Sequence, residues 1–83
     1  MKVNLRYFAS IRETIGVGSE TLDTTASTLA ALREELIARG GAYAESLARG
    51  RAVRVALNQT LSDEAAVLTD GAEVGFFPPV TGG

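Results

Sequence analysis

One amphipathic helix, set between segments that alternate like strands, is the feature that most constrains this fold. Its apolar face is formed by residues at helical spacing: Leu29, Leu32, Leu36 and, beside them, Ile37. Its solvent face is expected to carry Arg33, Glu34 and Glu35. Ser27 or Thr28 is a suitable N-cap, and Gly40-Gly41 is expected to end the helix because glycine tolerates the left-handed conformation found there. A single helix of this kind needs a sheet to cover its apolar face.

Strand-like alternation occupies both ends of the chain. Residues 2–8 alternate with period two, which places one set on the core face: Val3, Leu5 and Tyr7. Phe8 is anomalous, because it shares the opposite face with Lys2 and Arg6. Residues 73–77 form the last strand, with Val74 and Phe76 directed inward and Gly75 and Phe77 directed outward.

The intervening segments complete the predicted order. Residues 20–25 are expected to pair with residues 2–8 as an antiparallel hairpin through a loose connection. Residues 42–49 favour a short helical turn with Tyr43 and Leu47 as its apolar contacts, and residues 53–58 a third strand. Residues 59–71 are expected to be mostly connection, with a turn at Asp70-Gly71. The result is an α+β fold, a mixed sheet packed on one main helix. If the first and last strands are central neighbours, Phe8 and Phe77 lie close together on the outer face.

Composition excludes several classes of function. The chain of 83 residues has no cysteine and no histidine, which removes a disulfide framework, a thiol nucleophile and the usual metal ligands. With a net charge of −2 and scattered basic residues, we expect no nucleic-acid binding. The N-terminal residues 1–6 mix polar and apolar side chains, so we expect no signal peptide, no membrane association and a cytoplasmic location.

No catalytic constellation is visible in the charged residues. Glu34-Glu35 are interpreted as solvated carboxylates, because adjacent positions on a helix do not face each other, and Asp63-Glu64 are interpreted as part of a solvated connection. Arg49, Arg51 and Arg54 form a local positive cluster, interpreted as surface charge, with docking as the alternative.

The C-terminal segment carries the chemical interest. Pro78-Pro79 stops the last strand and favours an extended stem, which is followed by Val80, Thr81, Gly82 and Gly83. We therefore divide the chain into a folded domain, residues 1–77, and an extended Gly-Gly tail, residues 78–83. Terminal glycines are commonly frayed ends. A glycine terminus on a stiff stem, however, has no side chain to block access to its carboxylate in a narrow pocket of another protein. Phe8, Leu61 and Phe77 are interpreted as an apolar docking patch near that tail.

The run from Asp70 to Gly83 resembles the C-terminus of the MoaD family, the small subunits of molybdopterin synthase. Tyr7-Phe8-Ala9, followed by Ile11-Arg12-Glu13, resembles that family's opening strand and loop, and residues 56–59 its third strand. The chain departs from the family pattern at two positions, Ala72 where an acidic residue is common and Gly75 where alanine is common. The Phe-Phe-Pro-Pro lead-in to Gly-Gly is the most specific part of the resemblance.

The resemblance implies a ubiquitin-like β-grasp fold and the role of a sulfur carrier without catalytic activity of its own. It implies that Gly83 is the covalent attachment point and Gly82 its slim approach. An adenylyltransferase similar to ubiquitin-activating enzymes would use ATP and Mg²⁺ to activate the Gly83 carboxylate, and a sulfur donor would convert it to a thiocarboxylate. No cofactor is expected to bind the chain itself.

The resemblance also implies a partner, the large subunit of the synthase, with which the carrier is expected to form a heterotetramer. The large subunit would receive the tail. The sulfur would then pass to cyclic pyranopterin monophosphate and form the molybdopterin dithiolene. In this resemblance the partner interface comprises Phe8, Leu61, Phe77, Pro78, Pro79, Val80 and Thr81. Three alternatives stay open: a sulfur carrier for thiamine, tRNA thiolation, cysteine synthesis or a tungsten-containing pterin, a ubiquitin-like protein modifier, and a plain binding domain with an inert tail.

Overall fold

The computed structural model describes residues 1–79, which form one mixed sheet with three helices. The elements follow in the order β1 (Lys2–Tyr7), α1 (Ala9–Ile15), β2 (Ser19–Asp23), α2 (Leu29–Ile37), α3 (Gly41–Leu47), β3 (Arg54–Leu57), β4 (Thr60–Leu61) and β5 (Glu73–Phe77). The five-stranded sheet has the order β2-β1-β5-β3-β4. β1 and β5 are parallel neighbours in the centre of the sheet, which is the condition under which Phe8 and Phe77 were expected to lie close together. The other strand pairings are antiparallel.

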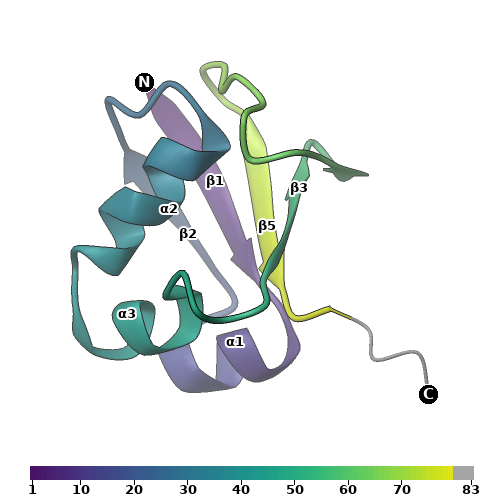
Figure 1. Ribbon diagram of the computed structural model, residues 1–83. Coiled ribbons are helices and arrows are strands. Elements are labelled where there is room, and N and C mark those ends of the chain that lie inside the picture. Colours follow the sequence, from purple (N-terminus) through teal and green to yellow (C-terminus); the bar gives the residue numbers. More distant parts are fainter. Residues whose placement is uncertain (80–83) are drawn as a thin grey trace.

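The core lies between the sheet and α2, which crosses one face of the sheet (Figure 1). The inward positions predicted from the alternation are all buried, and so are the leucines of the helix: Val3, Leu5, Tyr7, Val74, Phe76, Leu29, Leu32 and Leu36. The period-two and helical patterns therefore assigned these apolar positions to the core correctly. Thr28 is the N-cap, and its Oγ1 accepts a hydrogen bond from the Ala31 N–H at 3.2 Å.

The boundary between α2 and α3 differs slightly from the prediction. α2 ends at Ile37, so Gly40-Gly41 lie beyond its end and lead into α3 instead. Both glycines have positive φ, 75° and 56°. This is the left-handed conformation that was expected at these two positions and that glycine adopts readily. The predicted helical turn over residues 42–49 is confirmed as α3, in which Leu47 is buried and Tyr43 half-buried.

Two short elements were missed. The loose connection predicted between the first two strands contains α1, which turns its buried Ile11 and half-buried Ile15 toward the core and ends at Gly16 with φ 93°. The predicted connection over residues 59–71 contains β4, only two residues long. A seven-residue helix with two apolar contacts has a weak periodic signal, and a two-residue strand has none.

α1 and α3 lie together at the end of the sheet where β1 and β5 finish (Figure 1). β5 ends at Phe77, and Pro78 and Pro79 continue from it, half-buried, at that same end. The predicted tail residues Val80, Thr81, Gly82 and Gly83 lie outside the described residues. Within residues 1–79, no helix is long and apolar enough to cross a membrane.

Candidate functional site: an outer-face patch beside the C-terminal stem

Phe8 and Phe77 meet on the face of the sheet opposite α2. Their ring centroids are 6.2 Å apart and the rings are nearly perpendicular, an edge-to-face arrangement that aromatic pairs favour. Phe8 follows the end of β1 and keeps 43% of its surface exposed, whereas Phe77 is half-buried. The predicted proximity of these two residues is confirmed.

Leu61 extends this surface across the neighbouring strands. Strand register places Ala56 opposite both Leu61 on β4 and Gly75 on β5, so these residues form one row across the sheet. Leu61 is 59% exposed, so most of its apolar surface is available on this face. We call Phe8, Leu61 and Phe77 the outer-face patch.

A shallow groove of about 460 Å³ runs between the members of the outer-face patch, with Ala56 and Gly75 also among its lining residues. Gly75 was predicted to point outward, and it does lie on the outer face, but it is buried because the Phe8 ring covers it. A Cβ added at Gly75 would come within 3.2 Å of Phe8 Cε2. Glycine at this position therefore lets the Phe8 ring lie close against β5 and shapes the patch.

Two basic residues and one acidic residue border the patch, since Glu73 also lines the groove. Arg6 stands opposite Gly75 in the β1–β5 register, and its guanidinium lies 5.8 Å from the Phe8 ring centroid. Arg54 stands opposite Phe77 on β3 and is exposed. An apolar centre with cations at its edge is the arrangement expected of a protein-docking surface.

A buried arginine fixes the α3–β3 segment next to the stem. Arg33 was predicted on the solvent face of α2, and this was wrong: the residue is only 4% exposed. Its Nε donates to the Leu47 carbonyl at 2.7 Å, and its Nη2 donates to the carbonyls of Ala48 and Arg51 at 2.8 and 3.2 Å. In the folded chain, main-chain carbonyls of the α3–β3 segment lie against a face of α2 that helical periodicity alone predicts to be exposed to solvent.

Carboxylates interpreted as solvated take part in the same arrangement. Glu64 accepts from Arg33 Nη1 at 2.9 Å and from Arg49 Nη1, and Arg49 Nε donates to Glu34 at 2.6 Å. Burial by itself would raise the pKa of Glu64, but the hydrogen bonds from Arg49 and Arg33 outweigh it and lower that pKa. Of the predicted positive cluster, Arg49 is therefore neutralised within the chain.

A second polar cluster joins β2 to the helices. Glu20 accepts hydrogen bonds from Tyr7 Oη at 2.9 Å, Tyr43 Oη at 2.6 Å and Arg39 Nη1 at 3.0 Å. Partial burial acts to raise the pKa of Glu20, yet the hydrogen bonds from Tyr43, Arg39 and Tyr7 together lower it. No local sequence pattern indicates this cluster, because its members are far apart along the chain. It lies on the helix side of the sheet and has a structural role.

The fold and site together define a ubiquitin-like β-grasp domain whose last central strand leads directly into the C-terminal stem. The model of the ThiS family matches residues 5–83, and the chain belongs to that family.

Three relatives show the likeness in more detail. The chain is 42% identical to the molybdopterin synthase sulfur carrier subunit of Haemophilus influenzae over 81 residues, covering 98% of this chain and 99% of that one. It is 40% identical, with the same coverage, to the subunit of that description from Escherichia coli. Among solved structures, it matches a chain of the complex of subunits 1 and 2 of the molybdopterin-converting factor from Helicobacter pylori with a TM-score of 0.70 and 31% identity, covering all of both chains.

Proposed function

We propose that this chain is the sulfur-carrier subunit of a molybdopterin synthase, inactive as an enzyme by itself. The observation that carries the proposal is the outer-face patch, which is continuous with the strand and stem that lead to Gly82-Gly83. Full-length similarity to sulfur carrier subunits supports the same function.

The chemistry of the cycle follows from the terminal carboxylate. A carboxylate is a poor acylating group, so an adenylyltransferase would use ATP and Mg²⁺ to join Gly83 to AMP with release of pyrophosphate. The outer sulfur of a persulfide donor would then displace AMP to give an acyl disulfide, and a thiol reductant would cleave its S–S bond, leaving a Gly83 thiocarboxylate and a new disulfide on the donor side. This route lets a chain without cysteine carry sulfur.

The large subunit of the synthase is the proposed acceptor of the tail. The outer-face patch would pack against it, and the stem would carry Gly82 and Gly83 into its active site. There the sulfur would pass to cyclic pyranopterin monophosphate, and two deliveries would complete the dithiolene. The acid–base groups of the transfer belong to that subunit in this proposal, in keeping with the absence of histidine and cysteine here.

Intact mass spectrometry tests the covalent step. After incubation with the adenylyltransferase, ATP, Mg²⁺ and the sulfur donor, the full chain should gain the mass difference between sulfur and oxygen. A variant that lacks Gly83 should fold normally, because the tail contributes no described core residue, and should show no such gain. A wild-type chain that is never thiolated would contradict the proposal, and a mass increase equal to a whole protein would identify a modifier instead.

Binding to the large subunit tests the pathway. The Phe77→Ala variant should bind the large subunit more weakly, by roughly 1–3 kcal/mol if Phe77 is a central anchor. Capture of the wild-type chain only by enzymes of thiamine, tRNA or cysteine sulfuration would assign it to another pathway.

A further inference from the structure

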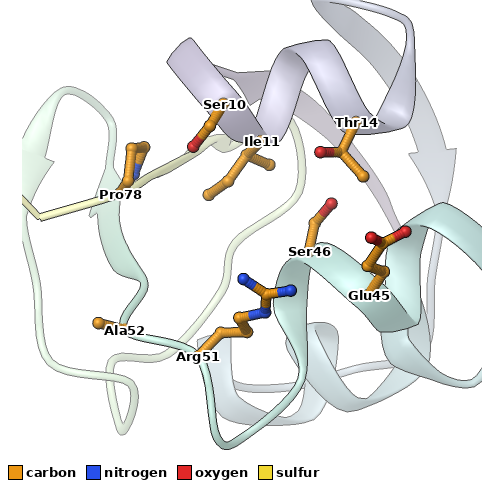
Figure 2. A pocket seen from close by; sticks show the side chains of 8 residues that line it. All are labelled: Ser10, Ile11, Thr14, Glu45, Ser46, Arg51, Ala52 and Pro78. Atoms are coloured by element: carbon orange, nitrogen blue, oxygen red, sulfur yellow. The ribbon is translucent and has the colours of Figure 1, made fainter.

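A cavity with a mixed polar and apolar lining adjoins the stem on the helix side of the sheet. It has a volume of about 310 Å³ and lies between α1, α3 and the segment that enters β3 (Figure 2). Pro78 lines one end of it, next to Ser10 of α1. Any protein that encloses the C-terminal tail must approach Pro78, and it therefore reaches the mouth of this cavity.

The cavity contains a buried hydroxyl without a partner. Ser46 is 9% exposed, and its Oγ makes no hydrogen bond with any described residue. In Figure 2 this hydroxyl points from α3 into the space below α1, toward Thr14. A buried polar group left unpaired is costly, so the arrangement favours an incoming polar atom.

Arg51 supplies a cation that the rest of the described chain does not neutralise. Arg33, Arg39 and Arg49 each form an ion pair with a carboxylate, whereas none is found for Arg51 among residues 1–79. Its guanidinium points into the cavity in Figure 2. A guanidinium presents its N–H groups in a planar fork that matches a carboxylate.

The backbone that carries these groups is held in place before any ligand arrives. The Arg51 carbonyl accepts from Arg33 Nη2 at 3.2 Å, and the Arg51 N–H donates to the Ala48 carbonyl at 2.8 Å. The same Arg33 side chain also binds the Leu47 carbonyl, next to Ser46. Such pre-organisation lowers the entropy cost of forming a contact.

Glu45 limits the charge that the cavity accepts. In Figure 2 its carboxylate lies at the end away from Pro78, near Thr14. Its negative charge repels a doubly charged phosphate about twice as strongly as a singly charged carboxylate at the same distance, so the cavity favours the carboxylate. The donors, the single cation and this acidic boundary together select an aspartate or glutamate side chain.

From these observations we infer that the cavity is a second docking site, in which Arg51 and Ser46 bind a carboxylate side chain of the synthase large subunit. The inference rests on the proposed function, because it names a further contact with the protein that receives the tail. It extends the interface from the outer-face patch around the stem to α1 and α3.

Affinity measurements with the purified large subunit from the same organism test the inference. The Arg51→Gln variant should raise the Kd about tenfold or more at low salt, as expected for loss of a charge-assisted hydrogen bond. The difference should shrink at high salt, because screening weakens the pair in the wild-type complex. Ser46→Ala should also raise the Kd without lowering the melting temperature, since the hydroxyl stabilises nothing in the free chain. Lys2→Gln is the matched control: it removes the same charge at the opposite end of β1 and should bind like the wild type.

The outcomes separate the inference from the proposed function. If Phe77→Ala weakens binding while Arg51→Gln does not, the second docking site is refuted and the sulfur-carrier proposal stands. If Arg51→Gln weakens only the complex with the adenylyltransferase, the occupant named here is wrong. If the wild-type chain does not bind the large subunit at all, both proposals fall.

Discussion

Replacing Arg33 with methionine should be among the most damaging single changes in this domain. Methionine keeps the apolar stem of the side chain but removes four hydrogen bonds, three of them to main-chain carbonyls. Glu64 retains Arg49 as a partner, so the cost comes mainly from the carbonyls of Leu47, Ala48 and Arg51.

The size of the effect can be worked from these contacts. An unsatisfied buried acceptor costs about 1–3 kcal/mol, and removal of one partner from a buried ion pair costs about 3–5 kcal/mol. Arg49 still forms an ion pair with Glu64 in the variant, and water reaches part of the exposed turn at Arg51. We therefore expect the free energy of unfolding to fall by ~3–4 kcal/mol. At ~0.05–0.15 kcal/mol per residue, the whole domain is stable by only roughly 4–12 kcal/mol. The melting temperature should accordingly fall by at least ~12 °C.

Urea unfolding followed by circular dichroism measures this loss directly. Arg54→Met is the matched control, because Arg54 is exposed and forms no ion pair among the described residues. The control should change the free energy of unfolding by less than ~0.5 kcal/mol. A loss below ~1 kcal/mol in Arg33→Met, with an unchanged denaturant slope, would refute the assignment of Arg33 as the clamp of the α3–β3 segment.

Three further predictions concern the ends and faces of the same elements. Because the folded-state pKa of Glu20 is depressed, its contribution to stability is complete above the unfolded pKa and is lost as the pH falls through the folded one. Glu20→Gln should therefore lower the free energy of unfolding by ~1.5–3 kcal/mol at pH 7 and by progressively less in acid. Urea titrations of both proteins across pH 2–7 measure this. A difference between variant and wild type that stays constant with pH would contradict the prediction. Gly75→Leu should displace the Phe8 ring and weaken binding to the large subunit, as measured by calorimetry. Gly75→Ala requires the ring to move by only a few tenths of an ångström, so this variant should bind nearly as the wild type does. If the leucine variant binds as tightly as the wild type, Gly75 does not determine the shape of the patch. Thr28→Ala should cost ~1 kcal/mol in thermal unfolding through loss of the N-cap, while Ser27→Ala, which removes no cap, should not.

The sequence by itself determined which faces of the strands enter the core. Period-two alternation assigned Val3, Leu5 and Tyr7 to the inside because side chains of a strand point alternately to its two faces. The same parity placed Phe8 and Phe77 on the other face, whereas the adjacency of β1 and β5 was a hypothesis that the strand pairing of the structure confirmed. The roles of Gly82 and Gly83 stay predictions, since they lie outside the described residues.

Only the tertiary structure decided which polar side chains are buried and what they contact. Helical spacing assigned Arg33 to the solvent face, because periodicity describes the angle around a helix axis and not what packs against it. The chain returns after α3 and places carbonyls of Leu47, Ala48 and Arg51 there, which makes burial of a guanidinium favourable. The cavity with Ser46 and Arg51 likewise depends on α1, the α3–β3 segment and Pro78, which are distant in sequence, so no local pattern predicts it. Local patterns fix which face a residue takes, whereas long-range packing decides whether that face meets water, a hydrogen-bond partner or another protein.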